Sequence, residues 1–449
     1  KKCCAPFEYI FGRQLIMNIA LSLKNTLLQH IGLMEQHKED FVKRPFQDFS
    51  RNSKLSFQNT ILSLISMERG SLKSEMQRFF DYSLDTPTPS AFVQQRDKLK
   101  PDTFKYLFSS FSQTLPSVEC NGFYFKAVDG SDILIPLEKE QEPYCYFRRK
   151  DQSAYHQVHL NAVYDLMSCQ YTAAYIEPRR GHDERKAFHK LFDENSFCPN
   201  TVFIFDRGYE SYSLMSHISS KNQFFIIRAK DWNTGGLLKG IPRPDMEEFD
   251  FIWDKIFVSK LLACHKEKTE KYQRVHSSDD PYFLNKQVKE YPLAFRVVRF
   301  QLDNGSYECL LTNLPQDKFD SSALKELYHM RWGIETSFRE LKHCIGLLDF
   351  HSKKVEAIEM EIWARLILYN YTTAVTNLLE KRKCRSKYVQ HLNLANAIHI
   401  CRQVLKQCTG KVLENADDLI VRELLPIRPD RNSPRKKHFH RPNKFNYRS

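Results

Sequence analysis

The chain has 449 residues, of which 42% are hydrophobic and 13% aromatic. It is too long for a single core and too apolar for global disorder, so we expect two or three folded domains. A formal net charge of +13 and a pI of about 9.0 predict a polyanionic partner, with nucleic acid ahead of an anionic membrane.

The sequence gives no indication of a membrane partner, because no uninterrupted apolar run approaches the thickness of a bilayer. The first 25 residues carry an apolar stretch that polar residues interrupt, which predicts an amphipathic helix rather than a signal peptide. The chain begins at Lys1 and not at Met, so a few native residues are expected to be missing. Twelve cysteines without a CxxC pair favour reduced thiols in the cytoplasm.

Residues 1–120 have the pattern of a helical domain. Ser56 opens an apolar-periodic run, Gly70 ends it, and Thr88 with Pro89 marks the cap and first turn of a later helix. Short helices joined by tight turns are typical of helix-turn-helix DNA-binding domains, although a solvated basic face on an ordinary bundle is the alternative. The candidate DNA contacts on this later helix are Gln94, Gln95, Arg96, Lys98 and Lys100.

Residues 121–228 change to three strand-like runs, followed by alternating helices and strands, which predicts an α/β fold with a mixed sheet and flanking helices. Residues 229–318 interrupt the alternation as a β-rich insertion with long loops and a hairpin at Asp303, Asn304 and Gly305. Helical patterns return over 319–350 and 351–425. The basic tail, 426–449, is predicted to be disordered and able to follow phosphates.

The segment from Tyr328 to Lys342 carries the most unusual pattern. On one helix, Tyr328, Arg331, Glu335 and Lys342 would share one narrow face at about 100° per residue, extended by Trp332. A carboxylate beside cations and aromatic rings suits a phosphodiester near a metal ion. An ordinary solvated helix face is the alternative.

That face is extended by Arg339, whereas Glu340 falls off it, so Glu335 is the preferred carboxylate of the segment. A break near Gly333 would leave only the part from Glu335 to Lys342 continuous.

Two carboxylates end strand-like runs: Asp129 in AVDGSD and Asp206 in FIFDRGY. Each alone is typical of a turn cap. Together with Glu335 they have the composition of a site for two metal ions on opposite sides of a scissile phosphate.

This combination resembles the bacterial insertion-sequence DDE transposases with a Tyr-Arg-Glu-Lys signature, over most of the chain. The resemblance implies a ribonuclease H-like catalytic domain interrupted by a β-rich insertion, in a protein that binds terminal inverted repeats and performs cut-and-paste transposition through hairpin ends. It implies a metal-binding catalytic triad of Asp129, Asp206 and Glu335, which holds two Mg²⁺ ions that Mn²⁺ can replace.

The same resemblance assigns phosphate contacts to Tyr328, Arg331 and Lys342, and base stacking to Trp332. Trp232 and Trp253 are candidates for a further stacking residue in the insertion, and no motif selects between them. The implied partners are double-stranded DNA and a second copy of the chain in the synapsed state, with a nucleoid-associated location when DNA is bound.

Other acidic and histidine residues are rival candidates for this site. Asp132 could support the triad or cap a turn, and alternation along HQVHL places His156 and His159 on different faces with ordinary strand roles. The remaining rival carboxylates border other strands; they are Asp165, Glu177 and Asp183. The alternative functions are a domesticated or inactive DNA-binding protein and a general nuclease of the same fold.

Overall fold

A computed structural model describes residues 18–137, 142–146, 155–232, 235–258, 270–275, 290–379, 390–406 and 413–426. The start of the predicted N-terminal amphipathic segment, 1–17, and the basic tail from 427 onward lie outside the described residues. Among the described helices, none is both long enough and apolar enough to cross a bilayer.

The N-terminal part is helical, as the pattern predicts. Ser56, Ser71 and Thr88 cap three of its helices through side-chain oxygens that accept a backbone amide. The helices are α1 (Ile19–Gln36), α2 (Phe57–Ser66), α3 (Leu72–Phe79), α4 (Pro89–Arg96) and α5 (Thr103–Thr114).

The C-terminal helices complete the same core. They are α11 (Val355–Leu378), α12 (Leu394–Lys406) and α13 (Ala416–Arg422). Residues 351–425 are not wholly helical, because β11 (Gln390–Leu392) and β12 (Leu424–Pro426) pair as a small antiparallel sheet.

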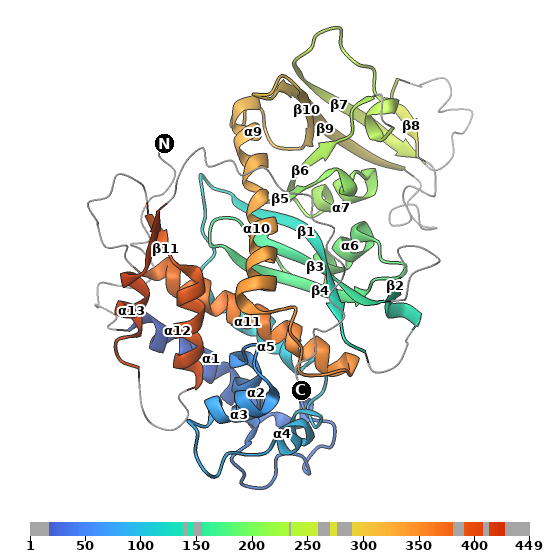
Figure 1. The fold of residues 1–449 in the computed structure, drawn as a ribbon. Coiled ribbons are helices and arrows are strands. Elements are labelled where there is room, and N and C mark those ends of the chain that lie inside the picture. The colour runs from blue at the N-terminus through green and yellow to red at the C-terminus, as the bar shows by residue number, and fades with distance from the viewer. Residues whose placement is uncertain are drawn as a thin grey trace.

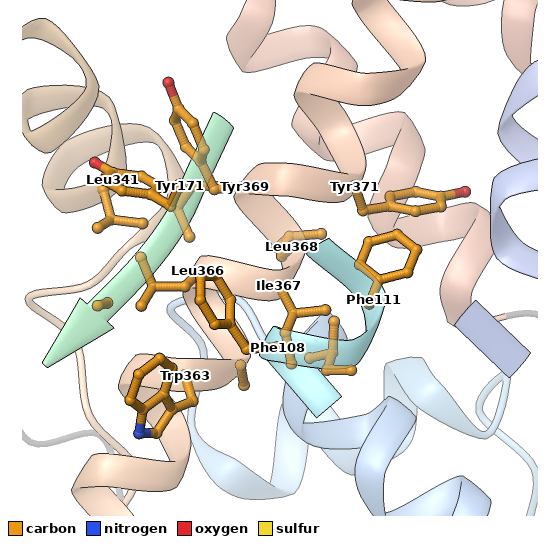
Figure 2. Packing of buried hydrophobic residues seen from close by; sticks show 14 of the residues in the cluster. Phe108, Phe111, Tyr171, Leu341, Trp363, Leu366, Ile367, Leu368, Tyr369 and Tyr371 are labelled. Carbon is orange, nitrogen blue, oxygen red and sulfur yellow. The ribbon is translucent and has the colours of Figure 1, made fainter. Parts of the chain in front are cut away.

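The helix α11 is buried along most of its length and lies between α5 and the main sheet (Figure 2). The ring centroids of Phe108 and Trp363 are 5.2 Å apart, and Asn370 Nδ2 donates to the carbonyl of Tyr171 at 2.7 Å. The N-terminal helices, the C-terminal helices and one face of the sheet therefore share one hydrophobic core.

The main sheet contains every other described strand (Figure 1). Its first part holds β1 (Tyr124–Ile135), β2 (Cys145–Tyr146), β3 (Tyr155–Asp165), β4 (Gln170–Pro178), β5 (Thr201–Phe205) and β6 (Phe224–Ala229). The strands β1, β3 and β4 pair antiparallel, whereas β5 and β6 continue from β1 in parallel. The helices α6 (Glu184–Glu194) and α7 (Tyr212–Ser220) pack on the face opposite α11.

The segment 229–318 extends this same sheet. Its strands are β7 (Phe249–Val258), β8 (Tyr272–Arg274), β9 (Glu290–Gln301) and β10 (Tyr307–Thr312). The strand β10 pairs antiparallel with β6, so the β-rich segment is joined edge to edge to the first six strands. The predicted hairpin connects β9 to β10, with Gly305 in the left-handed conformation at φ 81°.

The predicted single helix over 328–342 is wrong in its continuity. The structure has α9 (Ser321–Met330), α10 (Trp332–Glu340) and a π-helical turn over Leu341–Ile345. At the junction, the amide of Arg331 donates to Tyr328 O and the amide of Ile334 donates to Arg331 O, so the chain tightens for one turn. The face drawn at a constant 100° per residue therefore does not describe how Tyr328 and Lys342 reach the site.

The remaining short helical turns connect these elements. They are the 3-10 helices Lys38–Asp40, Glu142–Tyr144, Arg207–Tyr209 and Leu237–Gly240. The turn over Arg207–Tyr209 follows β5 directly and begins at Asp206.

Candidate active site

Asp129 and Asp206 lie at equivalent positions of two neighbouring parallel strands. The β1–β5 register pairs Ala127 with Ile204. Asp129 comes two residues after Ala127, and Asp206 comes two residues after Ile204. Asp129 Oδ1 accepts the amide of Gly130 at 2.8 Å, and Asp206 Oδ1 accepts the amide of Gly208 at 2.7 Å. Both carboxylates therefore lie where the parallel pairing of β1 with β5 ends. Asp206 directly follows β5, whereas β1 continues beyond Asp129 to Ile135, so the prediction that Asp129 ends a strand is wrong.

Glu335 reaches this end of the sheet on α10, which packs against β1. Gly333 allows the close approach, because a Cβ atom there would lie 3.2 Å from Leu166 Cδ2 and 3.8 Å from Tyr164 Cε1. Gly333, where the sequence allowed a break in the helix, is thus needed where α10 packs against the sheet. It remains helical at a cost of about 1 kcal/mol relative to alanine.

Arg331 joins two members of the triad. Its Nη2 donates to Glu335 Oε1 at 2.7 Å, and its Nη1 donates to Asp129 Oδ2 at 3.3 Å. The Arg331 side chain is only 7% exposed, whereas the side chains of Asp129 and Glu335 are 20% and 35% exposed. The guanidinium holds carboxylates from β1 and α10 within one hydrogen-bonded group.

Asp129 is in an unfavourable place for an isolated negative charge. Its pKa is raised to about 6, mainly because burial disfavours the charged form. The carboxylates of Asp206 and Glu184 act in the same direction, whereas the Gly130 amide and Arg331 oppose the shift. Asp129, Asp206 and Glu335 are half-buried carboxylates, and their oxygens are the ligands that suit Mg²⁺ or Mn²⁺.

The other residues of the predicted signature lie around the three carboxylates in different environments. They are Tyr328, Trp332 and Lys342. Tyr328 is buried, and its ring centroid lies 5.8 Å from the Arg331 guanidinium carbon. Trp332 is 51% exposed, so one ring surface is open to a partner. Lys342 Nζ donates to Ser131 Oγ and to the carbonyl of Asp132, both at 2.8 Å. The π-helical turn therefore brings Lys342 onto β1 beside Asp129.

A recess of about 370 Å³ lies next to Asp206, with Tyr307 and three basic residues in its lining. A second recess of about 290 Å³ shares Arg207 and Lys230 with it. The basic residues of the first recess are Arg207, Arg228 and Lys230. Neither insertion tryptophan lines either recess. Sequence reasoning did not find these cations, although Arg207 directly follows Asp206.

The insertion tryptophans are both half-buried and engaged with their own segment. Trp232 Nε1 donates to Ile241 O at 2.7 Å, and its ring meets Phe249 edge-on. Trp253 Nε1 donates to Gln273 Oε1 at 3.3 Å. Their role in base stacking remains a prediction.

The predicted N-terminal DNA contacts differ in accessibility. Gln94 is exposed, and Gln95, Lys98 and Lys100 are half-buried. Arg96 is 2% exposed and donates to Asp97 Oδ1 at 3.2 Å, so its guanidinium is part of the helical core. A phosphate contact by Arg96 would require it to leave this pair.

The rival carboxylates all have structural partners, and Glu177 accepts a hydrogen bond from Asn161 Nδ2 at 2.9 Å. Asp165 pairs with Lys126 at 2.9 Å, Asp183 caps α6, and Glu340 accepts the Tyr369 hydroxyl at 3.0 Å. Asp132 lies opposite His159 in the β1–β3 register, and its Oδ1 is 2.7 Å from His159 Nδ1. Sequence reasoning also missed Glu184, whose Oε1 lies 3.6 Å from His159 Nε2 at the start of α6.

The chain resembles known transposases. The family described as "Transposase DDE domain" matches residues 122–371, more than half of the chain. Transposase InsG for insertion sequence element IS4 from Escherichia coli (strain K12) is 25% identical over 299 residues, covering 63% of this chain and 60% of the relative. The transposase for insertion sequence element IS421 from Escherichia coli is 33% identical over 73 residues, covering 16% and 20%.

These matches cover only part of each relative, since the chain spans 60% of the length of InsG. Among solved structures, the piggyBac transposase synaptic complex with hairpin DNA aligns with a TM-score of 0.43 and 10% identity, covering 91% of this chain and 86% of the other.

Proposed function

Because the chain belongs to the transposase DDE domain family, we propose that it is a DNA transposase that cuts at transposon ends and joins them to a target. Two observations support this proposal: Asp129 and Asp206 follow the last residues of the parallel β1–β5 pairing, and Arg331 bridges Asp129 and Glu335. Sheet order supports a ribonuclease H-like core, because three antiparallel strands are followed by two parallel ones.

The triad carboxylates would hold two divalent ions, Mg²⁺ with Mn²⁺ as a substitute. Support comes from Asp129, whose burial raises its pKa and makes a neighbouring cation favourable. When bound, such ions supply an activated water or hydroxyl and stabilise the leaving oxygen. The protein itself fixes the carboxylates, since the Gly130 and Gly208 amides orient Asp129 and Asp206.

The basic groups around the triad would position the DNA strand. Arg331 presents further N–H donors beside Asp129 and Glu335, at a position suited to a phosphate oxygen. Lys342 and Tyr328 are proposed as additional phosphate contacts, and the exposed ring of Trp332 as a stacking surface for a base. Arg207 and Lys230 in the recess next to Asp206 would continue the path of the strand, whereas the third cation there, Arg228, pairs with Glu308 at 2.7 Å.

The finer steps are part of the proposal. Excision through hairpin ends needs an extruded base, for which Trp232 and Trp253 remain candidates. Binding of terminal inverted repeats is assigned to residues 1–120, with Gln94 as the most accessible candidate for reading a base. Two chains are proposed to assemble when two DNA ends are brought together.

The decisive experiment compares Glu335→Gln with Glu340→Gln on the same helix. We expect Glu335→Gln to abolish Mg²⁺-dependent cleavage of the element's own ends while retaining binding. Glu340→Gln should keep cleavage, because Glu340 only accepts a hydrogen bond from Tyr369. Equal activity of the two variants would remove Glu335 from the triad.

The same assay separates the alternatives. A general nuclease would cut DNA without the terminal repeats as fast as DNA that bears them, and an inactive DNA-binding protein would cut neither. The genomic DNA flanking the coding sequence supplies the substrate, and short inverted repeats with a target duplication would establish mobility.

A further inference from the structure

A second polar cluster lies on the other face of β1 from Lys342. Side chains alternate along a strand, so Ser131 faces Lys342 whereas Asp132 faces His159 of β3. His159, His182 and Glu184 each offer one ligand atom, and these three atoms lie within 4.8 Å of one another. The cluster combines two imidazoles with a carboxylate, unlike the all-carboxylate triad.

His159 is oriented like a metal ligand. Its side chain is 5% exposed, and its Nδ1 lies 2.7 Å from Asp132 Oδ1. Its Nε2 is buried without a hydrogen-bond partner among the described residues, 3.6 Å from Glu184 Oε1. Metal-binding histidines almost always donate their second ring N–H to a carboxylate, which directs the lone pair of the other nitrogen at the ion. Asp132 supplies that carboxylate.

Gly130 makes room for this arrangement. A Cβ atom at Gly130 would lie 2.1 Å from His159 Nε2, so any larger residue would displace the ring. The His159 and His182 rings lie close together, with centroids 4.3 Å apart. The backbone of β1 thus allows both imidazoles to face Glu184.

The charges of the cluster favour a divalent cation. Arg179 Nε lies 2.7 Å from Asp132 Oδ1, and its guanidinium also contacts His182. The two carboxylates of Asp132 and Glu184 exceed the single guanidinium of Arg179 by one negative charge.

We propose that His159, His182 and Glu184 bind a divalent transition-metal ion such as Zn²⁺, with Asp132 as the residue that positions His159. Imidazole nitrogen prefers such ions to Mg²⁺, so this site is chemically distinct from the triad. Its three protein ligands leave a fourth position open to water. In the alternative arrangement no metal ion is bound, and His159 and Glu184 share a proton instead.

The ion would brace the turn that carries Asp206. A Cβ atom at Gly208 would lie 3.3 Å from Glu184 Oε2 and 3.0 Å from Asp206 Oδ1, so the two carboxylates border the same glycine. Fixing Glu184 through the ion therefore limits the movement of the Asp206 turn. The proposed role is structural, and it does not depend on the proposed function.

The test measures Co²⁺ and Zn²⁺ binding to the full chain without DNA. Co²⁺ reports the site by its visible absorption, which is stronger for four ligands than for six, and Zn²⁺ competes for it. We expect one such Co²⁺ per chain, in the wild type and in the Asp129→Asn, Glu335→Gln variant alike. Loss of the band in that double variant would assign the ion to the triad and overturn the proposal.

Variants of the cluster complete the test. His182→Ala should weaken Co²⁺ binding at least 100-fold, and Asp132→Asn by about 10- to 100-fold, as for other residues that orient a ligand. His399→Ala, an exposed histidine of α12, is the matched control and should bind as the wild type does. His182 is half-buried in the turn before α6, and His182→Gln with a circular dichroism spectrum checks the fold. Wild-type protein without the band, or equal affinities of His182→Ala and His399→Ala, would refute the site.

Discussion

Arg331 donates a hydrogen bond of 2.7 Å to Glu335, one turn further along the same helical segment. The same guanidinium reaches Asp129 on β1, so it spans the gap between a helix and a strand. When no metal ion is bound, the Arg331 guanidinium offsets the negative charge of Asp129 and Glu335.

The first prediction concerns stability in the absence of metal. Arg331→Ala should lower the free energy of unfolding by about 1.5–3 kcal/mol in EDTA, because the half-buried carboxylates of Asp129 and Glu335 lose a charged donor. Saturating Mn²⁺ should reduce this deficit by neutralising the same oxygens. Thermal unfolding with and without Mn²⁺ measures both effects.

Lys325→Ala is the control, since its exposed pair with Asp303 is worth little. If Mn²⁺ leaves the stability loss of Arg331→Ala unchanged, the ion and the Arg331 guanidinium do not contact the same carboxylates.

The second prediction follows from the pKa of Asp129, which is raised from 3.8 to about 6. Between these values the folded state keeps a proton that the unfolded state has released, so the free energy of unfolding falls as the pH rises. The loss is at most about 3 kcal/mol for a shift of this size.

Asp129→Asn lacks this titration. Urea unfolding in EDTA should therefore show Asp129→Asn gaining stability over the wild type between pH 4 and pH 7. Parallel pH profiles of the two proteins would argue against a buried, protonated Asp129.

The third prediction tests the approach of α10 to the sheet. Gly333→Val would press against Leu166 and Tyr164, moving Glu335 away from Asp129. We expect cleavage to slow at least tenfold with DNA binding retained, since a displacement of about 1 Å can cost about 100-fold. Adding Leu166→Ala should restore part of the rate.

Gly32→Val is the matched helix control, because no atom lies within 4 Å of a Cβ built at Gly32. Its cleavage rate should equal that of the wild type. If Leu166→Ala fails to improve Gly333→Val, the contact is not what limits the position of Glu335.

The fourth prediction separates a phosphate contact from a buried ion pair. Arg331→Ala should lessen the slope of log K against log salt by about 0.9, the value for one lost phosphate contact on duplex DNA. Arg96→Ala should leave the slope unchanged and lower stability, because Arg96 is buried against Asp97. Binding to end DNA at several salt concentrations measures both, and the reverse pattern would make Arg96 the DNA contact.

The three carboxylates of the proposed triad could be selected from the sequence because their signals are local. Asp129 and Asp206 follow apolar strand runs, and strand pairing then brings them to one level of the sheet. Glu335 was selected by helical spacing, even though the segment is divided at Arg331.

Other features depend on contacts that no local pattern carries. The burial of Arg96 is set by helices packed around it, and the pairing of β10 with β6 joins residues far apart in the chain. The cluster of His159 with His182 likewise arises where β3 lies beside the loop after β4, and only the folded sheet brings the two rings together.

The burial of α11 has a consequence for biosynthesis. Tyr371, on α11, donates its hydroxyl hydrogen to the carbonyl of Ala20 at 2.6 Å, and Arg365 donates to the carbonyl of Leu64 at 3.2 Å. The N-terminal helices are synthesised first, but their packing partner α11 leaves the ribosome only after the whole main sheet has been translated. Until then their apolar faces remain uncovered, so the emerging chain offers chaperones a target.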